Sequence, residues 1–295
     1  MRVLVTGTGG RVGSVTAREF LDHGYEVRAF DKMPPPEDIR DRAEVVYADL
    51  TDRYALLRAA EGCDMIAHLA AIPHPGSLDD IIFQTNVTGT QYVLAAAEAH
   101  GIKKVALAST CCTFGIVFAQ HPFDPQYLPM DEAHPTLPQD LYGLSKLCNE
   151  QTAATYTRRT GMTTVCIRIS TVVSFDSKHA DAQRWQRRRL ENSHHWRAGD
   201  LWTYIEIRDC ARAFRLAVEK PTAGNHVVIL AARDSYTPYD IRGLVRQHYP
   251  SVAQDAERLE PKDSLYNTQH AEEVLGFVAE HSWRNVPELN DLDKA

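Results

Sequence analysis

The fold is decided by residues 3–13, which read VLVTGTGGRVG. An apolar run that ends at Thr6 is followed by a helical pattern from Arg11, with glycines in the turn between them. Glycine permits a tight turn and lets another group approach the backbone closely, and the free N–H groups of a helix N-terminus attract phosphate. The pattern therefore predicts a strand, a glycine turn and a helix that hold the pyrophosphate of a dinucleotide. The predicted contacts are Gly7, Gly10, Arg11, Val12 and Gly13.

The same alternation of short apolar runs and longer helical stretches continues along the chain. Short runs of this kind are typical of strands that are buried on both faces. Strands are predicted at Arg2–Thr6, Glu26–Phe30, Glu44–Tyr47, Met65–Leu69, Lys103–Ala108, Thr163–Arg168 and His226–Leu230, and a regular pattern returns at Trp202–Ile207. Helices are predicted at Arg11–His23, Arg53–Glu61, Leu78–His100, Asp140–Arg159, Arg208–Lys220, Pro238–His248 and Thr268–Leu275. This order predicts an α/β fold with a Rossmann-type, doubly wound parallel sheet.

Two parts of the chain interrupt this pattern. The segment Ser174–Asp200 is polar, and the tail from Ala231 is mixed in character. We therefore predict a small C-terminal substrate cap over the carboxyl edge of the sheet. The predicted division is a dinucleotide-binding domain, residues 1–172 plus 202–230, and a cap, residues 173–201 plus 231–295. The proline-rich stretches Met33–Pro36 and His121–Pro138 are predicted to be loops.

Asp31 ends the second predicted strand, 24 residues after the first glycine of the turn. A carboxylate there accepts hydrogen bonds from the ribose hydroxyls of NAD and repels the 2′-phosphate of NADP, so NAD is the predicted cofactor. Lys32 and Arg28 leave some use of NADP open, because a nearby cation tolerates that phosphate. Asp49, at the end of the third predicted strand, could contact the adenine of the cofactor, or equally act as the N-cap of the helix that begins at Arg53. The ends of the third and fourth strands supply the other predicted cofactor contacts, Asp49, Leu50, Leu69, Ala70 and Ala71.

Tyr142 and Lys146 lie one turn apart on a predicted helix and share one of its faces. A nearby ammonium lowers the pKa of a phenol by favouring the phenolate, which makes Tyr142 a candidate acid or base for a substrate hydroxyl. Thr110 ends the fifth strand, at the edge of the sheet where ligands collect in such folds. These three residues predict a site for proton exchange with an alcohol.

Composition excludes several classes of function. The chain has 295 residues, and its net charge of −7 disfavours nucleic acid or an anionic membrane as a partner. No apolar run approaches the roughly 18 residues of a membrane helix. Six cysteines without a C-x-x-C pair predict reduced thiols in a cytoplasmic protein. The neighbours His194 and His195 have no further ligands at zinc-type spacing, so no metal site is predicted.

The combination of motifs resembles a known enzyme family. Thr-Gly-x-x-Gly-x-x-Gly, Asp49-Leu50, His-Leu-Ala-Ala at residues 68–71 and Tyr-x-x-x-Lys occur together in the extended short-chain dehydrogenases/reductases. The nearest branch is the NAD-dependent sugar epimerase/dehydratase family, typified by UDP-glucose 4-epimerase. The stretch Tyr204-Ile-Glu-Ile-Arg-Asp209 is similar to a further block of that family, and the resemblance covers residues 1–230.

The resemblance implies an enzyme that moves a hydride from a carbohydrate hydroxyl to NAD. Tyr142 would take the hydroxyl proton, Lys146 would hold the nicotinamide ribose, and Thr110 would bind the same substrate oxygen. Asn86 and Ile169 are further cofactor contacts that the resemblance implies. The predicted substrate contacts are His74, Cys111, Thr171, Arg184 and Arg188.

Three departures from the family pattern narrow the reaction. Cys111 and Cys112 replace the Asp-Glu pair that sugar-nucleotide dehydratases carry after the active-site Thr, which disfavours elimination of water. The residues Arg168-Ile-Ser-Thr171, and the short span from there to Asp209, are more similar to the uronate dehydrogenase branch, which oxidises free sugar acids. A sugar or sugar-acid dehydrogenase is therefore the main hypothesis.

Several alternatives stay open. An epimerase that retains its cofactor uses the same hydride-transfer residues, and a non-catalytic dinucleotide-binding sensor uses the same fold. The four cap arginines, at 184 and 187–189, could clamp a carboxylate or a diphosphate, or lie on a solvated helix face. The family commonly dimerises through the two helices predicted here at Leu78–His100 and Asp140–Arg159, so a homodimer is expected.

Overall fold

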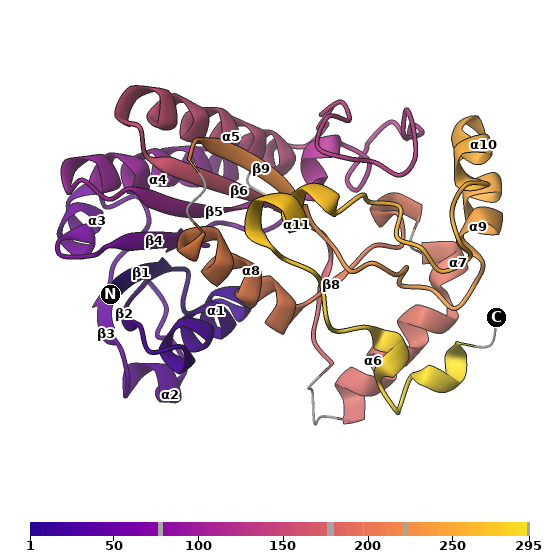
Figure 1. The fold of residues 1–295 in the computed structure, drawn as a ribbon, viewed down its shortest axis with the longest axis horizontal. Helices are drawn as coiled ribbons and strands as arrows, with labels where there is room; N and C mark the ends of the chain where they lie inside the picture. Colours follow the sequence, from indigo (N-terminus) through magenta and orange to yellow (C-terminus); the bar gives the residue numbers. More distant parts are fainter. Residues whose placement is uncertain (76–78, 176–179, 197, 221–222, 294–295) are drawn as a thin grey trace.

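The computed structural model describes residues 1–75, 79–175, 180–196, 198–220 and 223–293 of the chain. A sheet with helices on both faces forms one end of the molecule, and shorter elements from the second half of the chain gather at the other (Figure 1). The described residues contain no helix that is long and apolar enough to cross a membrane. The predicted helix start at Leu78 and parts of the polar segment Ser174–Asp200 lie outside the described residues.

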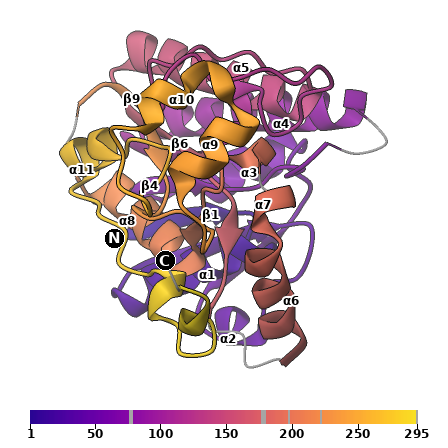
Figure 2. The same cartoon turned by 90° about the vertical axis from the view of Figure 1, so that its right-hand side faces the viewer.

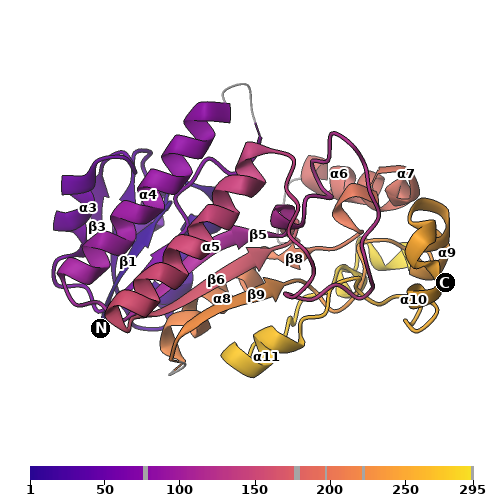
Figure 3. The same cartoon turned by 90° about the horizontal axis from the view of Figure 1, so that it is seen from above.

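The main sheet has seven parallel strands in the order β3-β2-β1-β4-β5-β6-β9. They are β1 (Arg2–Thr6), β2 (Glu26–Asp31), β3 (Glu44–Tyr47), β4 (Met65–His68), β5 (Lys104–Thr110), β6 (Thr163–Ile169) and β9 (Asn225–Leu230). The chain reverses its direction of progress between β1 and β4, which lie side by side. The predicted doubly wound parallel sheet is therefore confirmed, and its carboxyl ends point toward the shorter elements (Figure 3).

Helices cover both faces of this sheet (Figure 3). One face carries α1 (Arg11–Asp22), α2 (Glu37–Arg40), α8 (Ile207–Glu219) and α11 (Gln269–Leu275). The other face carries α3 (Arg53–Ala60), α4 (Asp79–Ala99) and α5 (Leu141–Thr160). Val3 and Val5 of β1 pack toward the first set and Leu4 toward the second, and all three are fully buried. Burial on both faces explains the continuous apolar runs of the sequence.

The remaining elements stand at the carboxyl edge of the sheet and are seen end-on in Figure 2. They include α6 (Ala180–Glu191), α7 (Ser193–Trp196), α9 (Ile241–His248), α10 (Ala253–Ala256) and a two-stranded ladder of β7 (Val172–Val173) and β8 (Ile205–Glu206). This is the region where the cap was predicted. The division of the chain into two domains stays a prediction.

The stretch Trp202–Ile207, where the sequence pattern becomes regular again, is only partly regular in the structure. Only Ile205–Glu206 is a strand, because Leu201 and Trp202 have positive φ angles of 57° and 50°. Left-handed backbone at a bulky residue costs about 1–3 kcal/mol. Burial of the Trp202 ring offsets that cost, together with a 2.7 Å hydrogen bond from its Nε1 to the carbonyl oxygen of Ser193.

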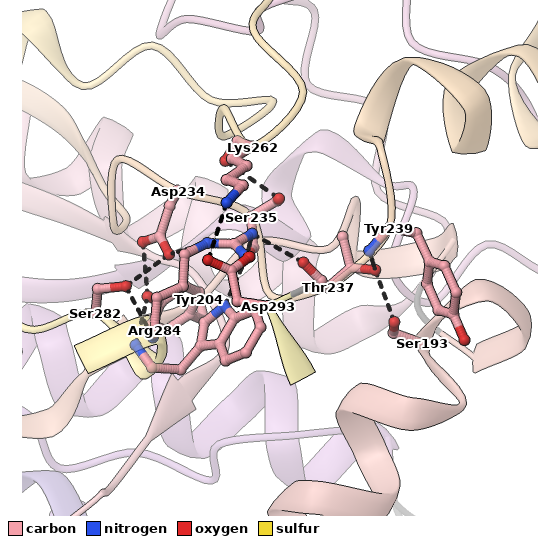
Figure 4. A network of polar contacts seen from close by, with 11 residues as sticks. Ser193, Tyr204, Asp234, Ser235, Thr237, Tyr239, Lys262, Ser282, Arg284 and Asp293 are labelled. Atoms are coloured by element: carbon pink, nitrogen blue, oxygen red, sulfur yellow. Dashed lines mark hydrogen bonds and ion pairs between the residues drawn. The ribbon is translucent and has the colours of Figure 1, made fainter. Parts of the chain in front are cut away.

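The last described segment folds back as a polar clasp, which we define as Tyr204, Asp234, Lys262, Ser282, Arg284 and Asp293 (Figure 4). Arg284 forms ion pairs with Asp234, at 3.1 Å, and with Asp293. Asp234 also accepts hydrogen bonds of 2.7 Å from the hydroxyls of Tyr204 and Ser282. The clasp thereby joins four segments that are far apart in the sequence.

Arg284→Ala is expected to lower the free energy of unfolding by about 2–3 kcal/mol, because Asp234 would stay largely buried without its cation. Chemical denaturation measures this loss. In the control Arg246→Ala, the lost ion pair with Glu257 has both side chains 52% exposed, so the expected cost is below about 1 kcal/mol. Equal losses in the two variants would contradict a stabilising role for the clasp.

Candidate active site

A cavity of about 520 Å³ opens at the carboxyl ends of β1, β4, β5 and β6. Most of the residues that the sequence nominates line it. They are Gly7, Gly10, Arg11, Val12, Gly13, Asp31, Asp49, Leu50, Leu69, Ala70, Ala71, Thr110, Cys111, Tyr142, Lys146, Ile169 and Thr171. The reversal of strand order beside β1 creates this crevice, as in other doubly wound sheets.

The glycine turn forms a cradle that side chains would fill. Gly7 has a φ of +85°, and a Cβ atom there would lie 2.7 Å from the backbone nitrogen of Ala70. A Cβ atom on Gly13 would lie 2.0 Å from the carbonyl oxygen of Gly7. No side chain caps α1 at Gly10, so the first N–H groups of the helix remain available to a phosphate. These features fit the pyrophosphate of a dinucleotide.

Asp31 lies at the rim of this cradle. Its two carboxylate oxygens accept hydrogen bonds of 2.9 Å from the backbone N–H groups of Gly9 and Met33. Gly9 is a residue that sequence reasoning missed. A Cβ atom there would lie 2.8 Å from the Met33 carbonyl oxygen, so only glycine lets this loop close on Asp31. The signal in the sequence was the extra glycine next to Gly10, the second glycine of the motif.

Arg28 and Lys32, the two cations that could tolerate the 2′-phosphate of NADP, differ in their position relative to the cavity. Arg28 does not line the cavity, because its guanidinium donates to the carbonyl oxygens of Ala59 and Glu61 at 2.8 and 2.6 Å. Lys32 does line the cavity, and its Nζ lies 3.6 Å from a carboxylate oxygen of Asp49. The end of the cavity near Asp31, where the ribose is predicted to bind, therefore carries charges of both signs.

Asp49 is not a helix N-cap. Its Oδ1 accepts hydrogen bonds from the backbone N–H and the hydroxyl of Thr51, at 2.9 and 2.8 Å, and the first of these bonds is the main reason that its pKa is lowered. The cap of α3 is Asp52, which accepts from the N–H of Ala55. The cofactor role of Asp49 stays a prediction.

A buried hydroxyl–imidazole chain supports the cradle from below. The Thr6 hydroxyl lies 2.7 Å from His68 Nδ1, and His68 Nε2 lies 3.0 Å from the Thr90 hydroxyl. Thr6 Oγ1 also accepts from the N–H groups of Leu69 and Ala70 at 3.2 Å. Burial lowers the pKa of His68 to about 3, so a neutral ring fixes the end of β4. Sequence reasoning read this histidine only as part of a motif.

Asn86 lies outside the residues that line the cavity. Its side-chain amide accepts from the Ile72 N–H at 2.8 Å and donates to the Ile72 carbonyl oxygen at 3.1 Å. The same amide donates to Ser145 Oγ at 3.1 Å. Asn86 therefore ties the loop after β4 to helices α4 and α5, which positions Ile72 in the cavity wall.

Thr110, Tyr142 and Lys146 converge at one end of the cavity. Thr110 ends β5 and caps the 3₁₀ turn Cys111–Phe114, while Tyr142 and Lys146 lie on the first turns of α5. Lys146 Nζ donates to the Ala108 carbonyl oxygen at 2.8 Å, and burial lowers its pKa to about 8. The start of α5 is fixed by Asp140, which accepts from the N–H of Gly143.

The prediction that Lys146 lowers the pKa of Tyr142 is wrong in this geometry. Burial raises the pKa of Tyr142, and a hydrogen bond with Thr110 acts in the opposite direction. The ammonium points to a backbone carbonyl instead of the phenol. Tyr142 is therefore a phenol that keeps its proton in this structure.

A buried ion pair underlies these residues. Arg168 on β6 and Glu150 on α5 form two hydrogen bonds, of 3.0 and 2.8 Å, with side chains only 6% and 3% exposed. The Ser109 hydroxyl donates to Glu150 at 2.6 Å. Such a pair fixes the relative positions of β5, β6 and α5. Sequence reasoning did not foresee it, because its members are far apart in the chain.

The predicted substrate contacts divide into two groups. Cys111 and Thr171 line the cavity, and the Thr171 hydroxyl donates to Asp200 at 3.0 Å. The other three, His74, Arg184 and Arg188, are exposed and do not belong to the lining. Residues without a prediction take their place in the wall, among them Phe118, Ser170, Thr203 and Tyr266.

Comparison with known proteins agrees with this geometry. Residues 3–231 match the NAD dependent epimerase/dehydratase family. A UDP-glucose 4-epimerase from Corynebacterium glutamicum is 26% identical over 96% of this chain and 92% of its own length. A uronate dehydrogenase from Pseudomonas putida is 32% identical over 80% of this chain and 78% of its own length.

A solved structure extends the comparison to three dimensions. The UDP-glucose 4-epimerase from Brucella ovis, in complex with NAD, covers 98% of this chain and 95% of its own at 25% identity and a TM-score of 0.70. NAD is thus the cofactor of the family, and the glycine turn described above has a shape that fits it. The protein is an NAD-dependent enzyme, and it belongs to the NAD-dependent epimerase/dehydratase family.

Proposed function

We propose that the protein oxidises a hydroxyl group of a carbohydrate and releases the electrons as NADH. The observation that carries this proposal is the convergence of Thr110, Tyr142 and Lys146 in the same cavity as the glycine cradle. A sensor would need the cradle alone, whereas a buried phenol and a buried amine beside it are the groups that alcohol oxidation uses.

Each residue has a part in the oxidation. Bound NAD supplies the hydride acceptor for the hydrogen on the sugar carbon. Thr110 and Tyr142 orient the hydroxyl oxygen. Tyr142 first loses its own proton to solvent, and the resulting phenolate takes the proton of the hydroxyl as the carbonyl forms. Lys146, held by Ala108 at 2.8 Å, orients the nicotinamide ribose. The two cysteines in place of an acid–base pair disfavour loss of water at the next carbon.

An epimerase is the second candidate, supported by the UDP-glucose 4-epimerase that is similar over 96% of the chain. The deciding test is to denature the purified protein, quantify the released nucleotide, and assay NADH formation with free aldoses, uronates and UDP-sugars. We expect little bound nucleotide and net NADH formation. Near-stoichiometric bound NAD or NADH, with sugar interconversion and no net NADH, would establish the epimerase instead.

The pH profile should follow the phenol. Because burial raises the pKa of Tyr142, its proton-accepting form is a small fraction below that pKa and grows about tenfold per pH unit. We expect kcat/KM for oxidation to rise between about pH 6 and pH 8 with a slope near one on logarithmic axes. Reduction of the product by NADH needs the protonated phenol and should not rise. A flat oxidation profile in this range would contradict the role of Tyr142.

Asp31→Ser should relax the choice of cofactor. The change removes the carboxylate that would bond the ribose hydroxyls and repel a 2′-phosphate. We expect the NADP-to-NAD ratio of kcat/KM to rise about tenfold or more, the size of one or two lost hydrogen bonds. Arg28→Met is the control, since its side chain points away from the cavity. An unchanged ratio in Asp31→Ser would remove Asp31 from cofactor selection.

We also propose a homodimer through α4 and α5, which lie side by side on one face of the sheet (Figure 3). The outer surface of α4 includes Ile81, a large apolar side chain that is 45% exposed. Sedimentation at micromolar concentration tests this, with Ile81→Glu as the variant expected to weaken association. A monomeric wild type would refute the proposal.

A further inference from the structure

Tyr266 separates two hollows of the molecule. It lines the active-site cavity with Thr110 and Tyr142, and it also lines an open groove of about 760 Å³ beside Pro129 and Asn267. Of the described residues that line either hollow, Tyr266 is the one common to both. Its side chain is buried, with 5% exposed. The phenol ring is therefore part of the wall between the cavity and the groove.

Three sets of contacts fix the position of Tyr266, two through the backbone of its segment and one through its ring. Tyr266 pairs with Met130 of the long loop after β5, with flanking hydrogen bonds from Met130 to Leu265 and from Asn267 to Met130 of 2.9 and 2.8 Å. Its ring lies 5.7 Å from that of Phe114, centroid to centroid. The segment that delivers it pairs with the loop carrying Asp234 of the clasp (Figure 4).

Several neutral polar groups line the cavity together with Tyr266, although Asp200 also lines it and the groove on the other side carries Arg233, Asp263, Glu272 and Glu273. Burial raises the pKa of Tyr266 well above its usual range and also raises the pKa of the neighbouring Cys111 thiol, so both groups keep their protons. The Ser170 hydroxyl lines the same cavity, is buried, and has no hydrogen-bond partner among the described residues. Neutral donors and acceptors of this kind match the hydroxyl groups of a sugar. The exposed Arg184 and Arg188, the candidate diphosphate clamp, lie outside the lining.

We propose that Tyr266 is a specificity-determining residue that closes the substrate end of the cavity, bonds a sugar hydroxyl and restricts the substrate to a free monosaccharide. The inference rests on the proposed oxidation and adds its substrate class. A nucleotide attached to the sugar would need the space that the phenol ring fills. The groove beyond the ring is where such a substituent would lie in a more open cavity.

The first variant tests the hydrogen bond. Tyr266→Phe keeps the ring and removes the hydroxyl, so KM for the best monosaccharide should rise about fivefold or more with little change in kcat. The matched control is Tyr249→Phe, a phenol equally buried, with 5% exposed, that does not line the cavity. Unchanged KM in Tyr266→Phe would overturn the contact with substrate.

The second variant tests the wall. Tyr266→Ala joins the cavity to the groove, so the ratio of kcat/KM for a UDP-hexose to that for the matching free hexose should rise about tenfold or more. Leu265→Ala removes a neighbouring buried side chain without opening the wall, and should leave the ratio unchanged. If the alanine variant does not fold, Tyr266→Leu tests a smaller loss of volume at the same position. An unchanged ratio in the folded variant would overturn the inference.

The substrate preference of the wild-type enzyme distinguishes the proposed role of Tyr266 from the proposed oxidation on which it rests. Oxidation of a free monosaccharide with at least tenfold preference over its UDP derivative is the expected result. Preference for the UDP-sugar, with net NADH formation, would overturn the role of Tyr266 and leave the oxidation intact. NAD binding without turnover of either class of sugar would refute the proposed oxidation itself.

Discussion

Tyr142→Phe is expected to lower kcat/KM for sugar oxidation by roughly 10²–10⁴-fold while NAD remains bound. The change deletes a single oxygen atom from a side chain that is 7% exposed, so the packing of α5 against the cavity stays as it is. The rate is measured by NADH formation. The dissociation constant of NAD is measured by calorimetry on the same preparation.

Tyr54→Phe is the matched control, because Tyr54 is 69% exposed on α3 and lies outside the cavity lining. It should retain the full rate. Undiminished turnover in Tyr142→Phe would remove the phenol from the reaction. Loss of NAD binding together with turnover would show instead that the phenol supports the cofactor site.

Gly13→Ala is the second change with a large expected effect. A Cβ atom on this residue would lie 2.0 Å from the carbonyl oxygen of Gly7, so the turn must open and its N–H groups must leave the phosphate. We expect NAD affinity to fall by about 100-fold or more, the size of two or three lost charge-assisted hydrogen bonds. The free energy of unfolding should also fall, by about 2–3 kcal/mol.

Gly243→Ala separates this steric effect from the general effect of replacing glycine. Gly243 lies within α9, and a Cβ atom there would meet only the end of the Arg246 side chain, at 4.0 Å. Alanine in a helix is favoured by about 0.5–1 kcal/mol over glycine, so this variant should be slightly more stable and bind NAD normally. Normal NAD binding by Gly13→Ala would contradict the cradle.

The strands and most of the residues that line the cofactor end of the cavity could be predicted from the sequence, because the patterns that indicate them are local. The glycines, Asp31 and the apolar runs of β1 to β6 each report on a few neighbouring residues, and strict burial on both faces leaves little freedom in reading them. Helix ends were accurate to within a residue or two where a cap residue marks them, as at Asp52 and Asp140.

The substrate half was less predictable because its contacts are not local. Tyr266 meets Met130 and Cys111 across more than a hundred residues, and no periodicity links them. The left-handed backbone at Leu201 and Trp202 could not be predicted, because neither residue is the glycine that usually marks such a conformation. The error over the pKa of Tyr142 has a similar origin, since spacing places Lys146 on its face of the helix but does not reveal its bond to Ala108.

The place of the substrate end and the clasp in the chain also bears on the order of folding during synthesis on the ribosome. Every predicted cofactor contact precedes residue 170, whereas Tyr266, Arg284 and Asp293 are synthesised about a hundred or more residues later. Domains tend to fold from the N-terminus as they emerge, and a ligand that binds only the folded form stabilises it. The residues that line the cofactor end of the cavity are therefore made before those of the substrate end, whereas one face of the sheet is fully covered only after α11 has been added.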